Sequence, residues 1–227
     1  MSVPMPSIQA EEGDPFFEGF VFHYDKDDAD SALLSDVVNK VLHHGGVVCP
    51  RYDAASVTHV VLKTLGQPGT PDEELYQLAR KDQKRIVSWA WVEACVKARE
   101  VLIIDDNPLY VPPPTLHGHP DMREVRVCVT GYTGERRTSL INMVQTLGAE
   151  YMRALDRKST HLVCFEFEGA KWAKANQTQS QRIVSHKWLE ECLRQWKRLP
   201  EGPFSTRSGK EEDELAAAAE AEIPDRK

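Results

Sequence analysis

The sequence predicts an α/β protein made of two similar domains, and three observations support this prediction. Short apolar runs typical of strands alternate with segments of helical apolar spacing, which favours mostly parallel sheets covered on both faces. The same order of segments occurs twice along the chain. Hydrophobic residues make up 41% of the 227 residues, enough to form packed cores in two small domains.

The duplication is visible in two pairs of matching segments. "VTHVVLK" at 57–63 matches "STHLVCF" at 159–165, and "RIVSWAWVEAC" at 85–95 matches "RIVSHKWLEEC" at 182–192. The pairs are offset by 102 and 97 residues, so the copies differ by five residues between the matched segments. The first copy holds the extra residues within "TLGQPGTPDE", and each repeat is roughly 90 residues long.

Each copy is predicted to form the same elements in the same order. In the second copy a strand at 125–130 precedes a helix with Leu140, Val144 and Leu147 on one face, and Gly148 is expected to end it. The remaining elements of this copy are strands near 150–152, at 161–165 and at 182–184, a short helix around 171–176 and a final helix at 186–196. Predicted helices of the first copy cover 31–43 and about 88–99.

Composition divides the chain further. Three consecutive prolines stiffen the segment between the copies, and the C-terminal segment has few core-forming residues but many Ala and Glu, which favour a weak helix. The predicted parts are a disordered leader at 1–14, a first repeat at 15–111, a proline-rich linker at 112–124, a second repeat at 125–205 and an acidic tail at 206–227.

The net charge of −7 is spread unevenly along the chain. Residues 125–205 hold 13 Lys and Arg against 8 Asp and Glu, a balance of +5, so the rest of the chain sums to −12. A basic second repeat in an acidic chain predicts an anionic partner for that repeat alone. A protein that coats DNA would be more basic overall, which favours a small anion.

The sequence lacks the residue patterns that several classes of function require. The five cysteines form no CxxC pair and the histidines no matching doublet, so we expect reduced, intracellular thiols and no metal site. "SGKEE" lacks the upstream glycine of a P-loop, and no Ser/His/Asp or paired-carboxylate arrangement stands out. No apolar run approaches the length of a membrane span. The sequence therefore predicts a protein that is not an enzyme, needs no cofactor and does not enter a membrane.

The stretch "VTGYTGERR" at 129–137 suggests either an ordinary turn or half of an anion pocket. Thr130 offers a hydroxyl and Gly131 an unobstructed backbone N–H at the end of a predicted strand. Arg136 and Arg137 add positive charge at the start of the next helix, whose dipole also favours anions.

Three elements in both copies resemble the signature of BRCT domains. They are a Gly-Gly or Gly-Ala after the first helix, Thr-His-Leu/Val-Val on a core strand and Trp-x-x-x-Cys on the last helix, and the resemblance covers about 16–205. "VTGYTGERR" and "FEGAKWAKA" make the second copy similar to phosphopeptide-binding BRCT repeats of PTIP-like and topoisomerase II-binding DNA-damage scaffolds. "RIVSHKWLEECLRQWKRLPEGPF" looks closest to a plant PTIP-like group. The resemblance implies two tandem BRCT domains, each a four-stranded mostly parallel sheet flanked by three helices.

The resemblance also implies a phosphate site in the second repeat. Such repeats place Ser/Thr-Gly at the end of the first strand, an Arg at the start of the first helix and a Lys at the start of the second. The matching residues here are Thr130, Gly131, Arg137 and Lys171. Charge-assisted hydrogen bonds contribute roughly 1.5–3 kcal/mol each before desolvation, so phosphorylated and bare peptides should differ about a hundredfold in affinity.

Two neighbouring residues are candidate peptide contacts. Arg136 is either a solvated helix charge or a contact to the peptide, and Trp172 either packs under its helix or lines a peptide groove. The first repeat departs from the family pattern, because its first strand continues into "DKDDAD" without a Ser/Thr-Gly. Glu74 stands twelve residues before Ile86, where Lys171 stands before Ile183, so carboxylates would repel a phosphate there.

By resemblance, the chain is expected to read phosphoserine/phosphothreonine peptides as a scaffold in the DNA-damage response in the nucleus. Its partner would be a phosphorylated histone tail or a phosphorylated repair or checkpoint protein. Two alternatives are a phosphate-independent protein interaction module and binding of DNA ends through a 5′-phosphate. The sequence leaves open the flanking-residue specificity, the kinase and pathway, the oligomeric state and whether the chain is a piece of a longer scaffold.

Overall fold

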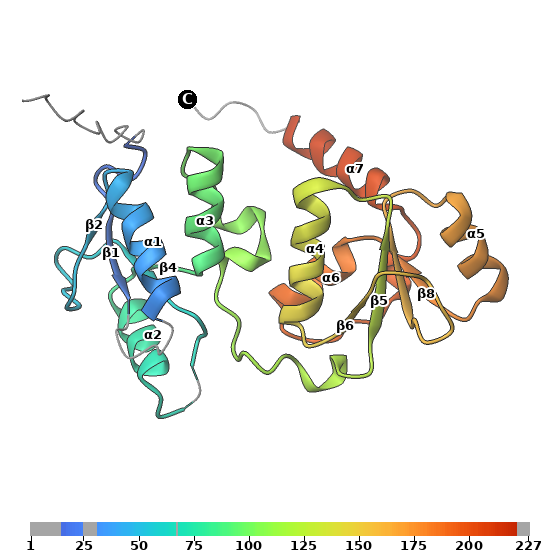
Figure 1. The fold of residues 1–227 in the computed structure, drawn as a ribbon, viewed down its shortest axis with the longest axis horizontal. Helices are drawn as coiled ribbons and strands as arrows, with labels where there is room; N and C mark the ends of the chain where they lie inside the picture. The colour runs from blue at the N-terminus through green and yellow to red at the C-terminus, as the bar shows by residue number, and fades with distance from the viewer. Residues whose placement is uncertain (1–14, 25–30, 67, 222–227) are drawn as a thin grey trace, which may run out of the picture. The chain divides into compact units, whose positions relative to one another are not determined.

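The computed structural model describes residues 15–24, 31–66 and 68–221, which fall into two compact units. The first unit ends at Asp106 but also takes in 110–112, and the second holds 107–109 and everything from Pro113 onward (Figure 1). The leader expected to be disordered and the aspartate-rich segment 25–30 lie outside the described residues.

The first unit is built around one parallel sheet of order β2-β1-β3-β4. Its elements are β1 Val21–Tyr24, α1 Ser31–His43, β2 Val47–Val48, β3 His59–Val61, α2 Pro71–Lys81, β4 Arg85–Val87 and α3 Trp89–Ala98. One core cluster contains side chains of α1 and α3, and a second contains side chains of α2, so helices cover both faces of the sheet.

The second unit repeats this arrangement with a parallel sheet of order β6-β5-β7-β8. Its elements are β5 Arg126–Thr130, α4 Gly134–Thr146, β6 Glu150–Met152, β7 His161–Cys164, α5 Gly169–Thr178, β8 Arg182–Val184, α6 Lys187–Arg194 and α7 Gly209–Ala221. Short 3-10 turns at Ile104–Asp106, Pro108–Tyr110, Pro120–Met122 and Gly202–Phe204 complete the chain. The predicted α/β fold with two four-stranded parallel sheets is confirmed.

Strand alternation assigns the two faces of the second sheet to different helices. Val127 and Val129 point into a cluster formed with α4 and α6, whereas Cys128 points to the face covered by α5. Figure 1 shows α4 and α6 on one side of the sheet and α5 on the other. Thr130 lies two residues beyond Cys128 and therefore shares the α5 face.

The Trp-x-x-x-Cys element holds the chain segment that follows the last helix. The Trp188 side chain is buried, and its indole N–H donates to the backbone oxygen of Leu199 at 3.0 Å. The Leu199 N–H in turn donates to the Cys192 sulfur at 3.3 Å. Trp91, Cys95 and Leu102 make the equivalent bonds in the first unit, at 2.9 and 3.3 Å.

The Thr-His element joins two neighbouring strands. The Thr160 hydroxyl accepts a bond from the Arg126 N–H at 2.8 Å and donates to the Arg126 carbonyl at 3.1 Å. The buried His161 ring then stacks on Trp188, with ring centroids 4.5 Å apart and planes 10° apart. The same motif in the first unit stacks His59 on its own tryptophan at 5.4 Å and 9°. Both motifs therefore stabilise the sheet and the core.

The length difference between the copies lies just before the second helix of each unit. Nine residues (62–70) link β3 to α2, whereas four (165–168) link β7 to α5. The extra five residues of the first unit therefore precede α2.

Gly148 has φ +81°, which suits its predicted place after α4. No helix among the described residues is long and apolar enough to cross a membrane.

Candidate phosphate-binding site

Thr130 and Gly131 lie where β5 leaves the sheet. The Phe165 N–H donates to the Thr130 carbonyl at 3.0 Å, which fixes the end of β5 beside the end of β7. Gly131 has φ +81°, and a Cβ there would lie 2.8 Å from the Phe165 Cβ. The Gly131 backbone is exposed, whereas Thr130 is half-buried. Only glycine meets both the torsion and the close approach at this position.

Lys171 lies in the first turn of α5, on the sheet face shared by Thr130. Its Nζ is 3.5 Å from the Cys128 sulfur, two residues before Thr130 on the same strand. Burial raises the pKa of the Cys164 thiol to about 12, and the Lys171 charge acts in the opposite direction. Thr130 and Gly131 at the end of β5 and Lys171 in the helix after β7 therefore stand at the same carboxyl end of the sheet, while the Lys171 ammonium contacts Cys128.

Arg137 reaches back toward the sheet from the first turn of α4. Its Nη1 donates to the carbonyls of Val129 at 3.2 Å and Tyr132 at 3.4 Å, and its Nη2 donates to the Tyr151 hydroxyl at 2.7 Å. These bonds hold the turn that contains Thr130 and Gly131. A guanidinium has five N–H groups, so Nε–H and one Nη2–H remain outside these bonds.

Arg136 is engaged by the acidic tail. Both of its terminal nitrogens bond the Asp213 carboxylate on α7, and Nη2 also donates to His186 Nε2 at 3.1 Å. The guanidinium carbon lies 5.5 Å from the centre of the Tyr132 ring and 5.8 Å from that of Phe165. The hydrogen bond to Asp213 raises the pKa of Arg136.

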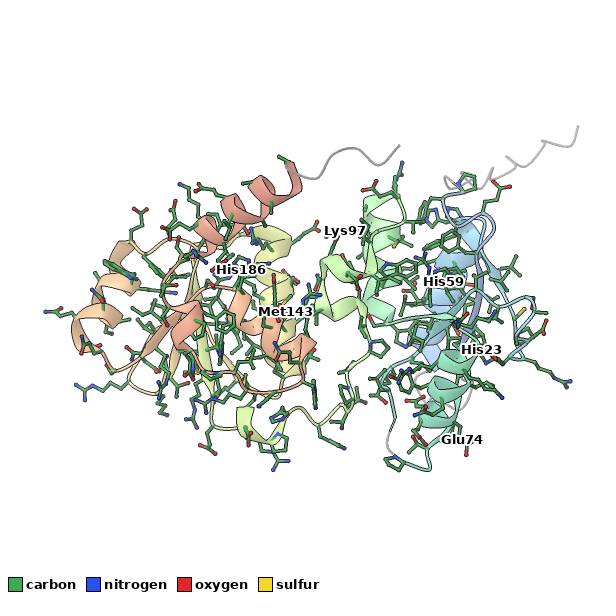
Figure 2. All side chains as sticks on the ribbon, turned by 180° about the vertical axis from the view of Figure 1, so that it is seen from behind. His23, His59, Glu74, Lys97, Met143 and His186 are labelled. Carbon is green, nitrogen blue, oxygen red and sulfur yellow. The ribbon has the colours of Figure 1, made fainter. Side chains whose placement is uncertain are left out.

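Sequence reasoning missed the buried network behind Arg136. The Tyr132 hydroxyl lies 3.0 Å from His186 Nδ1 and donates to the Cys164 carbonyl at 3.2 Å. Burial lowers the pKa of His186 to about 4, so the ring is neutral near pH 7. Figure 2 shows the His186 side chain within the second unit. Because Arg136 donates to Nε2, the proton of this neutral ring belongs on Nδ1, facing the tyrosine oxygen. No short-range pattern marks these residues as partners.

The sequence does contain a signal for the tail helix. Ser208 and Glu211 form a capping box, in which the Ser208 N–H and hydroxyl donate to the Glu211 carboxylate at 2.7 and 2.8 Å. The Ser-x-x-Glu spacing could have predicted where α7 begins. The contact between Asp213 of α7 and Arg136, 77 residues earlier in the chain, could not have been predicted from this spacing.

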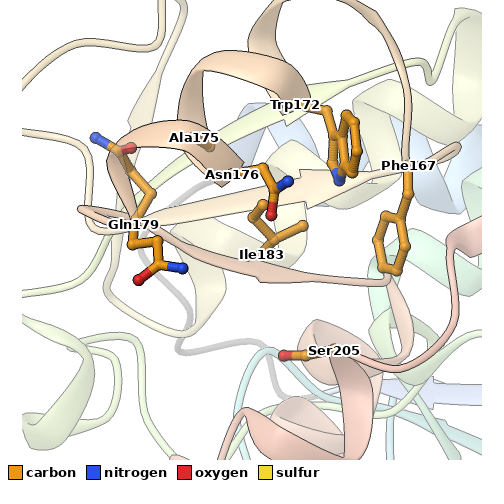
Figure 3. Close-up of a pocket in the computed structure, with 8 residues that line it drawn as sticks. Phe167, Trp172, Ala175, Asn176, Gln179, Ile183 and Ser205 are labelled. Carbon is orange, nitrogen blue, oxygen red and sulfur yellow. The ribbon is translucent and has the colours of Figure 1, made fainter.

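Trp172 packs under its helix, and its role as a peptide contact stays a prediction. It packs against the core cluster of Cys128 and Leu162 and also lines a hollow of about 330 Å³ beside α5 (Figure 3). The hollow is lined by Phe167, Trp172, Ala175, Asn176, Gln179, Gln181, Ile183 and Ser205. Among the residues that the structure describes, no group of three or more His, Cys, Asp or Glu could hold a metal ion.

The corresponding position in the first unit holds a carboxylate. Glu74 is exposed in the first turn of α2, and Asp72 and Glu73 share that turn. Because the five extra residues precede α2, Glu74 and Lys171 stand at the same distance from β4 and β8. The charge at this helix start is therefore reversed between the units.

Family models match both units. The BRCT (BRCA1 C Terminus) domain model matches 12–96 and the twin BRCT domain model matches 125–188, which together span more than half of the chain. The chain is a tandem pair of BRCT domains. BRCT domains in general are interaction modules rather than enzymes.

This BRCT pair is similar to parts of much longer proteins. It is 33% identical to the BRCT domain-containing protein At4g02110 of Arabidopsis thaliana over 184 residues, or 80% of this chain and 13% of that protein. It is 28% identical to PAX-interacting protein 1 of Bos taurus over 192 residues, or 83% of this chain and 18% of that protein. The chain thus spans less than a fifth of either relative.

Solved structures agree in fold. Yeast Rtt107, crystallised with Mms22, has a TM-score of 0.72 at 17% identity, covering 87% of this chain and 46% of that one. The third and fourth BRCT domains of S. pombe Rad4 have a TM-score of 0.64 at 18% identity, covering 85% of this chain and all of that one. At these identities the likeness shows the tandem BRCT fold.

Proposed function

We propose that this BRCT pair reads phosphoserine/phosphothreonine peptides through its second domain. The phosphate would be bound by Thr130, Gly131 and Lys171, with Arg137 beside them. The observation that supports this proposal most directly is that β5 ends at Thr130 and Lys171 stands in the first turn of the helix that follows β7, at the same end of the sheet. These groups come from two different segments, as a built anion site requires.

The chemistry of the three groups suits a phosphate. The Thr130 hydroxyl and Gly131 N–H each donate one hydrogen bond, and the first turn of α5 adds the positive end of a helix dipole. Lys171 has a long flexible stem, so its ammonium can leave the Cys128 sulfur for a dianionic ligand. Arg137 holds the turn and keeps two N–H groups for the phosphate or for water.

The proposed cellular role is that of a scaffold in the DNA-damage response in the nucleus. Its partner would be a phosphorylated histone tail or a phosphorylated repair or checkpoint protein. The resemblance of the second domain to phosphopeptide-binding repeats of DNA-damage scaffolds supports this role, as does the relation to PAX-interacting protein 1. The acidic start of α2 supports a single phosphate site, located in the second domain.

The test is fluorescence-polarisation binding to degenerate phosphoserine and phosphothreonine peptide libraries, with unphosphorylated libraries as reference. We expect micromolar, phosphate-dependent binding that falls by about a hundredfold in Lys171→Ala. Lys174→Ala is the matched control, because Lys174 lies one helical turn further along α5 and its side-chain Nζ donates to the Leu155 carbonyl at 3.5 Å. Equal binding of both libraries would reject the phosphate site and favour a phosphate-independent interface.

Titration with DNA tests the remaining alternative, which is binding of DNA ends through a 5′-phosphate. A 5′-phosphorylated duplex end is titrated against the same proteins at several salt concentrations. Binding to DNA ends through many backbone phosphates would give a steep salt slope, whereas one phosphopeptide contact gives a shallow slope. Tighter, salt-steep binding to the duplex than to any peptide would overturn the peptide-reader proposal.

A further inference from the structure

The start of α7 is fixed beside the end of β5. The Lys210 N–H donates to the Phe165 carbonyl at 2.8 Å, while the Phe165 N–H donates to Thr130. Lys210 Nζ also bonds Glu166 at 3.0 Å. Gly209 packs so closely that a Cβ there would lie 2.0 Å from the Tyr132 hydroxyl. One residue, Phe165, therefore connects the proposed phosphate site to the tail helix.

The anion that α7 brings to this place is the Asp213 carboxylate. It makes a two-pronged contact with Arg136, whose guanidinium lies against the Tyr132 and Phe165 rings. The Phe165 Cβ is the atom that a Cβ at Gly131 would touch. The Phe165 side chain therefore contacts both the Gly131 turn and the Arg136 guanidinium.

The surroundings of Arg136 are those of a preformed carboxylate receptor. The neutral His186 ring accepts one of its N–H groups and holds the guanidinium in place, and the two aromatic rings flank it. A fixed, planar guanidinium binds carboxylates in a two-pronged geometry. Asp213, which belongs to the same chain, occupies this receptor, and the side chains of both Arg136 and Asp213 are partly exposed.

We propose that Arg136 is a second anion-binding position, which binds an acidic side chain flanking the phosphorylated residue of the ligand. In the free protein, Asp213 occupies this position. This inference rests on the proposed phosphopeptide function and specifies which residues beside the phosphorylated one are preferred. The ligand's carboxylate would replace Asp213, so α7 competes with acidic peptides. A neutral flanking residue would leave the pair of Arg136 and Asp213 intact.

The test uses the full chain and two pools of phosphoserine peptides, one with Glu and one with Gln at the positions flanking the phosphoserine. The measured quantity is the ratio of the two affinities within each variant, because a general effect on folding cancels in that ratio. The variants are Asp213→Asn, Arg136→Gln and the matched control Glu214→Gln, which removes the same charge from an exposed residue of α7.

We expect Asp213→Asn to raise the preference for the Glu pool by about two- to fivefold, the range for a partly exposed ion pair. Glu214→Gln should change it little, and Arg136→Gln should reduce the ratio to about one. Phosphate-dependent binding with the same ratio in Asp213→Asn and Glu214→Gln would overturn this inference and leave the phosphopeptide function standing. Binding of neither pool above an unphosphorylated pool, in any variant, would reject both together.

Discussion

Gly131 combines a left-handed backbone with a close approach to Phe165, and Gly134 offers a comparison three residues later. Both have positive φ, +81° and +55°, but a Cβ at Gly134 meets nothing within 4 Å. Each alanine substitution should therefore cost about 1 kcal/mol of unfolding free energy for its backbone. Gly131→Ala should cost more, because its Cβ would lie 2.8 Å from Phe165.

Urea unfolding followed by circular dichroism compares these two variants within one domain. We expect Gly131→Ala to be the less stable of the two and to weaken phosphopeptide binding, because its exposed N–H must move. Equal stabilities would show that the Phe165 side chain moves aside with no loss of unfolding free energy.

His59 makes the stability of the first domain dependent on pH. Burial lowers its pKa to about 4, and its buried Nε2 has no hydrogen-bond partner among the described residues. The unfolded chain protonates this group at about 6.5, so its contribution is present above pH 6.5 and is lost as the pH falls through 4. The full loss is about 3 kcal/mol.

Hydrogen exchange of the β3 amides measures this loss directly. We expect the opening free energy at Val60 to fall between pH 6.5 and 4 and to become independent of pH over that range in His59→Phe. His161 should show a weaker trend, because burial lowers its pKa but Glu201, 3.1 Å from its Nε2, raises it. A Val60 free energy that stays constant between pH 6.5 and 4 would contradict the account.

At the scale of residues, the sequence was informative where a local motif corresponds to a local contact. Thr130, Gly131 and Lys171 could be named as candidates because each belongs to a recognisable segment, and their role in phosphate binding stays a prediction. The contact between Arg136 and Asp213 could not be predicted, since it joins two segments 77 residues apart. The inward bonds of Arg137 were equally hidden, because they depend on the path of the chain beyond β5.

At the scale of elements, the start of α7 is held by a cap. Its first turn is held by the capping box of Ser208 and Glu211, while most of its later side chains are exposed. Ser208→Ala should therefore cost about 1 kcal/mol, or about fivefold faster amide exchange throughout α7. Thr206→Ala is the control, since Thr206 is exposed and lies outside the helix. Unchanged exchange in Ser208→Ala would show that packing alone holds α7.

The elements of the repeats could be predicted because their apolar spacing repeats twice along the chain. The helix expected around 171–176 extends to Gly169–Thr178, and the last helix, expected to reach 196, ends at Arg194. The ends of these helices depend on left-handed residues such as Gln179 and Trp196, which composition does not mark. The tail was expected to be a weak helix, and its contacts with α4 and with Phe165, just after β7, are what the sequence did not reveal (Figure 1).

At the scale of the whole molecule, two copies of one fold differ in the charge at the start of their second helix. We expect Lys171→Glu to reduce phosphopeptide affinity by about two orders of magnitude. Glu74→Lys, the reciprocal change in the first domain, should leave affinity within about twofold, because that domain has no Thr-Gly at the end of β1. Isothermal titration of both variants with one phosphopeptide tests this. A large gain in affinity or a second binding site in Glu74→Lys would contradict it.

The most direct measurement of the central claim is a crystal structure of the chain with the tightest-binding phosphopeptide. We expect phosphate oxygens within hydrogen-bond distance of the Thr130 hydroxyl, the Gly131 N–H and Lys171 Nζ, with Lys171 turned away from the Cys128 sulfur. A phosphate bound to the first domain, or one that leaves these three groups without contact, would contradict it.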